Sequence, residues 1–170
     1  DAYLATTHVV ADGRPIVWLS RLQGRAVSLV PGSELVWPLC ALAARLDAPV
    51  ALVGATPEAL DRAAARLTAV YPELRVVLCH APPFGFDPEG ATADEAIARL
   101  HDSGAQLCFV ALGAPKQERF AVRALRHLPQ MGFVSVGAGI DFVAGTQIRA
   151  PRWVRRLTLE WVWRMMLNPR

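Results

Sequence analysis

Three polar side chains follow short apolar runs of the sequence, where a side chain can reach a bound ligand. Asp12 precedes Gly13, Gln117 follows a Gly-Ala-Pro-Lys turn, and Asp141 follows a Gly-Ala-Gly-Ile turn. A carboxylate such as Asp12 could accept a proton as a general base, and a glutamine amide both donates and accepts hydrogen bonds. Each residue also has a plainer interpretation. Asp12 could form a turn with Gly13, Gln117 could mark an exposed helix start, and Asp141 could cap a helix.

Glycine-containing turns follow four of the apolar runs, at residues 11–13, 54–57, 113–115 and 137–139. Glycine lets a ligand approach the backbone closely, and the start of the helix that follows favours an anion. A phosphorylated or nucleotide ligand is therefore expected. The alternative is that these turns simply close strands.

Positive charge is concentrated at the C-terminal end of the chain. Residues 149–170 hold six arginines and one acid, whereas residues 1–148 hold twelve basic and fourteen acidic residues. Three of the five tryptophans also lie in the C-terminal segment. Arginine with tryptophan is typical of a segment on an anionic membrane surface, but also of a solvated basic helix or of a nucleic-acid binder. The confinement of the charge to one segment argues against nucleic acid.

The elements that must position these residues alternate between short apolar runs and helical patterns. Strands are expected at residues 7–10, 50–53, 75–78, 106–112 and 133–136, and helices at 15–22, 34–46, 57–70, 92–101 and 116–128, with Pro151 opening a basic amphipathic C-terminal helix. This pattern predicts an α/β fold, with a Rossmann-like parallel sheet and helices on both faces. We expect an α/β domain at residues 1–148 and a membrane-associating segment at residues 149–170.

Composition narrows the function further. The chain of 170 residues is 53% hydrophobic and 19% charged, which excludes disorder and indicates one domain. Its three cysteines, Cys40, Cys79 and Cys108, have no metal-pair spacing and favour a reducing compartment. The sequence has no Walker A motif, Gly-x-Ser-x-Gly motif or complete dinucleotide fingerprint, and its histidines lack ligand spacing. A metal-independent reaction without a cofactor is therefore favoured.

Four blocks of residues, in their order and spacing, resemble the WecG/TagA/CpsF family of bacterial glycosyltransferases. The blocks are Ala11-Asp12-Gly13 with Pro15 and Val17-Trp18; Gly113-Ala114-Pro115-Lys116-Gln117-Glu118; Val136-Gly137-Ala138-Gly139-Ile140-Asp141-Phe142 with Ala144-Gly145; and Arg149-Ala150-Pro151-x-Trp153 with Leu159-Glu160-Trp161 and Arg164. The loop Pro82-Pro83-Phe84-Gly85-Phe86 fits as well. The resemblance covers essentially the whole chain.

The resemblance implies an inverting, metal-independent glycosyltransferase. Such an enzyme moves N-acetylmannosamine, or a related sugar, from a UDP donor to undecaprenyl-diphosphate-linked N-acetylglucosamine, for cell-surface polysaccharide or teichoic acid. It also implies a peripheral protein on the cytoplasmic face of the bacterial membrane, bound through residues 149–170, and self-association. The alternative is a non-catalytic UDP-sugar-binding module of the same fold.

The resemblance also assigns roles to individual residues. Asp12 matches the catalytic base, Gln117 an active-site glutamine that binds sugar hydroxyls, and Asp141 a nucleotide-binding aspartate. Arg164, and after it Arg149, would neutralise the leaving diphosphate, because arginine can bind it through paired hydrogen bonds. The other expected binding residues lie in the turns and are Gly13, Gly54, Ala55, Gly113, Ala114, Pro115, Lys116, Gly137 and Ala138.

The chain departs from the family pattern at Leu29, which stands where an arginine is common. The resemblance therefore does not guarantee the usual donor or diphosphate contact, although Arg25 could compensate through a shifted loop. A Thr-x-Asn motif that usually precedes the aspartate is missing, and further family arginines would lie beyond Arg170. We expect the chain to be a fragment, truncated at both ends.

Overall fold

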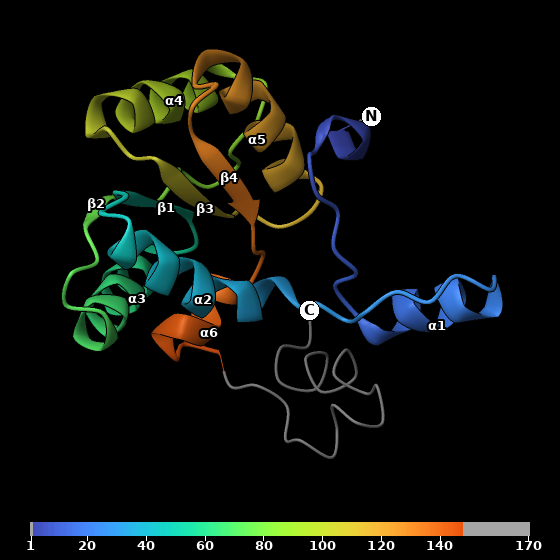
Figure 1. Ribbon diagram of the computed structural model, residues 1–170. Coiled ribbons are helices and arrows are strands. Elements are labelled where there is room, and N and C mark those ends of the chain that lie inside the picture. Colours follow the sequence, from blue (N-terminus) through green and yellow to red (C-terminus); the bar gives the residue numbers. More distant parts are fainter. Residues whose placement is uncertain (1, 148–170) are drawn as a thin grey trace.

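The described residues form a four-stranded parallel sheet with helices on both of its faces (Figure 1). The structure is a computed structural model that describes residues 2–147. It confirms the predicted α/β fold. The predicted C-terminal helix and the boundary at residue 149 lie outside the described residues.

The sheet consists of β1 (Val50–Gly54), β2 (Val76–His80), β3 (Leu107–Ala111) and β4 (Gly132–Ser135), in the order β2-β1-β3-β4. The two inner strands, β1 and β3, are almost entirely buried. Helices cover these strands on both sides, which explains why their sequences are continuous apolar runs rather than alternating ones. Gly54 pairs with Ala111, so the inner strands end at the same level.

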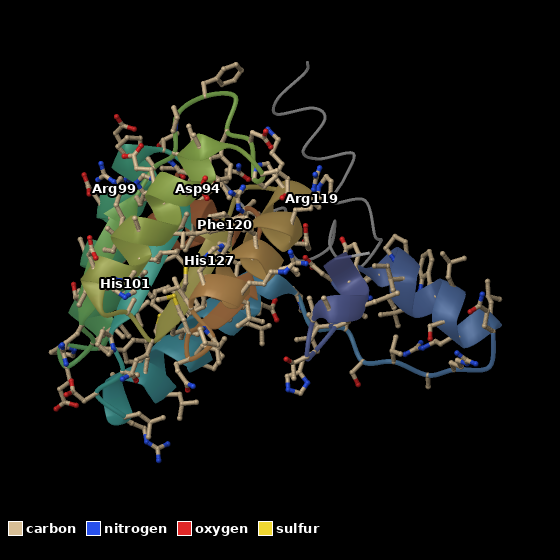
Figure 2. The ribbon with its side chains drawn as sticks, turned by 90° about the horizontal axis from the view of Figure 1, so that it is seen from above. Asp94, Arg99, His101, Arg119, Phe120 and His127 are labelled. Atoms are coloured by element: carbon tan, nitrogen blue, oxygen red, sulfur yellow. The ribbon has the colours of Figure 1, made fainter. Side chains whose placement is uncertain are left out.

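One face of the sheet is covered by α2 (Gly32–Arg45), α3 (Pro57–Val70) and α6 (Gly139–Ala144). The other is covered by α4 (Ala91–Ser103) and α5 (Lys116–His127). Leu52 and Phe109 belong to the core of the first face. Figure 2 shows Phe120 of α5 directed toward the interior, where its ring meets Phe86 edge to face at 5.6 Å.

Helix α3 has the bounds that the sequence predicts, residues 57–70. Thr56 is the N-cap, and its hydroxyl oxygen accepts the backbone N–H of Ala59 at 3.2 Å. Pro57 occupies the first turn, where its missing N–H costs nothing. Residues 81–90, which join β2 to α4 and include the loop quoted from Pro82 to Phe86, form neither a helix nor a strand.

The predicted strand at residues 7–10 is wrong. Val9 and Val10 are exposed, and the nearest sheet-like pairing is an isolated parallel bridge between Ala11 and Leu29. A short apolar run needs a neighbouring strand to complete its backbone hydrogen bonds, and the described sheet offers none here. The glycine turn at 11–13 therefore does not close a strand of the sheet, unlike the turns after β1, β3 and β4.

Residues 2–31 form what we call the N-terminal arm. It comprises η1 (Ala2–Ala5), a 3-10 helix that contacts α5, and α1 (Arg14–Leu22), which was predicted at residues 15–22. Figure 1 shows α1 extending away from the sheet, beyond the helices that cover it. The arm then returns to the domain, where it leads into α2.

Candidate functional site

The described residues that the sequence singled out gather at the C-terminal edge of the sheet. Gly54 and Ala55 end β1, the segment 113–116 follows β3, and Gly137 with Ala138 follows β4. Because all four strands are parallel, these ends share one edge, which is where ligands bind in such sheets. Three of the four glycine turns named from the sequence therefore lie together at this edge, each after a strand of the sheet.

Asp12 reaches this edge from the N-terminal arm. A Cβ atom placed on Gly32 would lie 3.8 Å from the Asp12 Oδ2 atom and 3.3 Å from the carbonyl oxygen of Ser135. The Asp12 carboxylate thus lies beside the first turn of α2 and the end of β4, and it is exposed. A carboxylate so placed is accessible to a ligand bound at the edge of the sheet.

The bridge between Ala11 and Leu29 fixes the base of the arm. The backbone N–H of Val30 donates to the carbonyl oxygen of Ala11 at 3.0 Å. Leu29, which the resemblance matches to the position of a common arginine, therefore lies beside Ala11, one residue from Asp12. The substitution lies next to the candidate base, and its effect on substrate choice remains a prediction.

Gln117 is 7% exposed and connects two of the turns. Its Oε1 atom accepts the backbone N–H of Gly137 at 2.9 Å, and its Nε2 atom donates to Glu118 Oε1 at 2.8 Å. A carboxamide has two donor and two acceptor positions, so half of this capacity is already used within the protein. The predicted role in binding sugar hydroxyls would fall to the remaining N–H and lone pair.

Glu118 is a functional candidate that the sequence analysis missed, although it belongs to a quoted block. Its side chain is 7% exposed, and its Oε2 atom is buried with no hydrogen-bond partner in the described part of the chain. A carboxylate is costly to bury without partners. Periodicity predicts burial for Gln117, which lies on the same stripe of α5 as Phe120 and Ala124. At 100° per residue Glu118 falls between Leu125 and Val122, so the same periodicity could have indicated its burial.

The turn between β4 and α6 packs tightly against α2. A Cβ atom on Gly139 would lie 3.0 Å from the Val136 Cβ atom and 3.1 Å from the Ser33 Cα atom, so a side chain there would force a shift. The Cβ position of Gly32 borders both Asp12 and Val136, so the first turn of α2 meets Asp12 and the start of the β4–α6 turn together. The structure therefore brings Asp12 and the Gly137 turn to one place.

Asp141 is half-buried in the first turn of α6. Burial raises the pKa of its carboxyl group, while the Thr146 hydroxyl, which donates to Asp141 Oδ1 at 3.3 Å, acts in the opposite direction. Arg66 of α3 donates to the carbonyl oxygen of Val143 at 2.9 Å and anchors this helix to the domain. No contact among the described residues joins Asp141 to Asp12, so its role in nucleotide binding stays a prediction.

The ends of β1 and β3 are closely apposed. Gly54 has φ 103°, and a Cβ atom on it would lie 2.4 Å from the carbonyl oxygen of Ala111, so only glycine fits. Ala55 also has a positive φ, 59°, and its N–H donates to the same oxygen at 3.1 Å.

The turn after β3 contains a cis peptide bond between Ala114 and Pro115. These turns expose backbone groups of residues 113–116 at the edge of the sheet.

A separate hollow of about 450 Å³ lies between α3, β2 and α4, and it is lined by none of the predicted site residues. His80 lies at its base, with a buried Nε2 atom that has no partner among the described residues. Burial, followed by the charge of Arg99, lowers the pKa of this histidine. Arg99 is itself paired with Glu95, at 2.9 Å. The hollow is therefore a poor match for a diphosphate.

Residues 2–147 contain neither a metal-binding cluster nor a membrane-spanning helix. No three histidine, cysteine or acidic side chains of this range come together as a metal site. No helix in the same range combines the length and the hydrophobicity that crossing a bilayer requires. Arg149 and Arg164, predicted to bind the diphosphate, lie outside the described residues.

Comparison with known proteins adds independent information. The family described as "Glycosyl transferase WecG/TagA/CpsF family" matches residues 1–170. The chain is also 29% identical, over 171 aligned residues, to the N-acetylglucosaminyldiphosphoundecaprenol N-acetyl-beta-D-mannosaminyltransferase of Bacillus subtilis (strain 168). This alignment covers 99% of the chain but 64% of the relative. The chain thus spans somewhat less than two thirds of that protein's length.

Proposed function

Because the chain belongs to the WecG/TagA/CpsF family of glycosyltransferases, we propose that it catalyses the transfer of N-acetylmannosamine, or a related sugar. The donor is a UDP-sugar, and the acceptor is N-acetylglucosamine linked through a diphosphate to undecaprenol. The name of the Bacillus subtilis relative describes transfer of a mannosaminyl group to such an acceptor. The relative supports the sugar and the acceptor, and the family supports the type of reaction.

The observation that carries the proposal is the position of Asp12. Its exposed carboxylate lies beside the start of α2 and the end of β4. In the proposed step, the acceptor hydroxyl oxygen attacks the anomeric carbon of the donor as the bond from that carbon to UDP breaks. Asp12 takes the hydroxyl proton, and UDP leaves with the bonding electrons. A single displacement of this kind inverts the anomeric centre.

The binding roles follow from the same arrangement. Gln117, held by Gly137 and Glu118, would contact sugar hydroxyls through its remaining N–H and lone pair. Asp141 would accept the N–H of uracil. Arg149 and Arg164 would bind the leaving diphosphate, so that the reaction needs neither a metal ion nor a cofactor.

The proposed place of action is the cytoplasmic face of the bacterial membrane, because the acceptor is a membrane lipid. Residues 149–170, rich in arginine and tryptophan, would hold the protein there as a peripheral component. The product would enter teichoic acid or another cell-surface polysaccharide. Self-association of the protein is a further part of this proposal.

Leu29 favours a second candidate function, a UDP-sugar-binding module without transfer activity. Its aliphatic side chain replaces an arginine beside Ala11 and Asp12. Loss of that charge would remove one contact to the donor diphosphate. This alternative predicts UDP binding without turnover.

The test is UDP release by the full-length protein. The substrates are UDP-N-acetylmannosamine and a short-chain lipid-diphosphate N-acetylglucosamine. Release that depends on the acceptor, is lost in Asp12→Asn and persists in Asp102→Asn would support the transferase. Asp102 is a matched control, since its side chain is 81% exposed on α4. UDP binding without release by the unmodified protein would instead favour the binding module.

A further inference from the structure

Helix α1 presents its apolar side chains to the outside of the protein. Ile16, Trp18, Leu19 and Leu22 are all exposed, Trp18 by 53% and Leu22 by 83%. At 100° per residue these four side chains, with Pro15, occupy one continuous arc of the helix. Helices on the surface of a domain normally turn such an arc toward the core.

The opposite side of α1 is occupied by the arm itself. Val17 is buried. The backbone N–H of Arg25 donates to the carbonyl oxygen of Ser20 at 2.9 Å, and the Ser20 hydroxyl donates to the carbonyl oxygen of Arg25. The chain that follows α1 thus folds back on the Val17 and Ser20 side and leaves the apolar arc uncovered. Figure 1 and Figure 2 both show α1 projecting from the domain.

The charges on α1 and on the segment that follows it have one sign. Arg14 and Arg21 flank it on α1, Arg25 follows the helix, and residues 13–33 contain no acidic residue. An apolar arc with arginines beside it and a tryptophan within it is the pattern of a helix that lies in a membrane interface. Each arginine near an anionic bilayer adds to the attraction.

We propose that α1 docks on the surface of an anionic lipid bilayer. Charge complementarity selects this occupant over two others. The chain's own residues 149–170 carry a net charge of +5 and would be repelled by the arginines of α1. A second copy of α1 would bring the same arginines together. Of these three occupants, only the anionic bilayer offers both apolar contact and opposite charge.

Docking in this way has a consequence that rests on the proposed function. Asp12 lies two residues before the start of α1. A helix lying in the interface would place this base near the depth of lipid headgroups, where a lipid-linked diphosphate acceptor is held. The arm would then bring the base to the acceptor, while the domain holds the donor.

The experiment places a fluorophore on the arc of the full chain. Cys79, the exposed cysteine of the described residues, is changed to serine, and Leu22→Cys is labelled with an environment-sensitive dye. Vesicles of phosphatidylglycerol and phosphatidylcholine should shift its emission to the blue, and quenchers in the acyl region should reduce it. The same dye at Leu46→Cys, exposed at the end of α2, should not respond.

Charge and apolar contact are then varied separately, and partitioning is followed by vesicle flotation. Arg14, Arg21 and Arg25 are changed together to glutamine. The α1-dependent partitioning onto vesicles should then weaken about 100-fold, roughly fivefold for each arginine. The control changes Arg45, Arg62 and Arg126 to glutamine, which alters net charge equally on other exposed helix positions. The apolar arc is tested in the same way with two double variants. One changes Leu19 and Leu22 to serine, and the control changes Leu42 and Leu46 to serine.

Three outcomes would overturn the proposal. If the emission of a dye at position 22 does not change with vesicles although the protein co-floats with them, membrane binding belongs to residues outside the arm. A blue-shifted emission in a monomer without vesicles would show that the chain's own segment covers the arc. A shift that grows with protein concentration, together with a dimeric mass, would assign the arc to a second copy. None of these measurements requires transferase activity, so each can fail or succeed separately from the proposed reaction.

Discussion

The N-terminal arm and the α/β domain use apolar residues in opposite ways. In the domain, β1 and β3 are buried between two layers of helices, and Phe109 and Phe120 are completely enclosed. In the arm, Tyr3, Leu4 and the apolar arc of α1 are largely exposed. Burial of apolar surface is the dominant favourable contribution to folding. The domain therefore supplies the stability, and the arm, which contributes little of it, carries the candidate base.

The comparison predicts that substitutions in the two regions have different consequences. Those in the arm should affect turnover or membrane contact while the free energy of unfolding stays nearly constant. Those in the domain should first lower that free energy.

Asp12→Asn should lower turnover about a thousandfold, within the range that a lost general base produces. Because the Asp12 carboxylate is exposed, the free energy of unfolding should change by less than about 0.5 kcal/mol. Acceptor-dependent UDP release and chemical denaturation of the same preparation measure both quantities. An unfolding change as large as that of a core substitution would contradict the separation of the two regions.

Phe120→Ala should lower the free energy of unfolding by about 4 kcal/mol, because it removes a fully buried ring from between α4 and α5. Leu22→Ala, the corresponding truncation in the arm, should change it by less than about 0.5 kcal/mol. Urea denaturation followed by circular dichroism compares the two variants. Equal losses would show that α1 packs on the domain in solution.

Thr56→Ala should lower the free energy of unfolding by about 1 kcal/mol, because it removes the oxygen that accepts the Ala59 N–H at the start of α3. Thr56→Ser keeps that oxygen and should retain most of the stability. The arm offers a contrast, since Gly13 caps α1 with no side-chain hydrogen bond. Thermal unfolding of the two Thr56 variants checks the prediction, which a large loss in Thr56→Ser would contradict.

His80 and His8 should differ in their effect on stability below neutral pH. Burial lowers the pKa of His80 in the folded state, so the unfolded chain binds a proton more readily. Stability should therefore fall as pH drops below about 6.5, the ordinary histidine pKa, toward the lower folded value. His80→Gln should remove part of this fall. His8→Gln, at an exposed position of the arm, should leave it unchanged.

This effect is measured by denaturation at a series of pH values between about 5 and 8, a range that includes the ordinary histidine pKa. The test compares how steeply the free energy of unfolding falls with pH in the two variants, not the slope for either variant alone. If both variants flatten the curve equally, the burial of His80 does not explain the acid sensitivity.

The sequence predicted the domain well because its signals there agree with one another. The run at residues 50–53 is apolar, and Thr56 with Pro57 gives both a cap and a first helical residue, so β1 and α3 were placed almost to the residue. The run at residues 7–10, Thr-His-Val-Val, also ends in β-branched apolar residues, but it has no partner strand in the described fold. Composition alone does not reveal whether a partner exists, which is why that strand was predicted wrongly.

The candidate site was predicted in part. Glycine turns and a parallel sheet were enough to place the turn residues at one edge. The link from Glu118 through Gln117 to Gly137 was not foreseen, because it joins residues twenty positions apart through side-chain amide geometry. Helix α6 was missed as well, since six residues beginning with glycine carry little periodic signal.

The bridge between Ala11 and Leu29 makes the chain between them a closed loop that can be replaced as a unit. Both ends of the excursion that contains α1 are held at adjacent backbone positions, and Val30 donates to Ala11 across the junction. Doubling the length of such a closed loop costs only about 0.6 kcal/mol. Longer, shorter or differently charged inserts could therefore be exchanged between residues 14 and 28 without displacing Asp12. On the proposed docking of α1, the fold thus separates adjustment to a given lipid composition from maintenance of the candidate site.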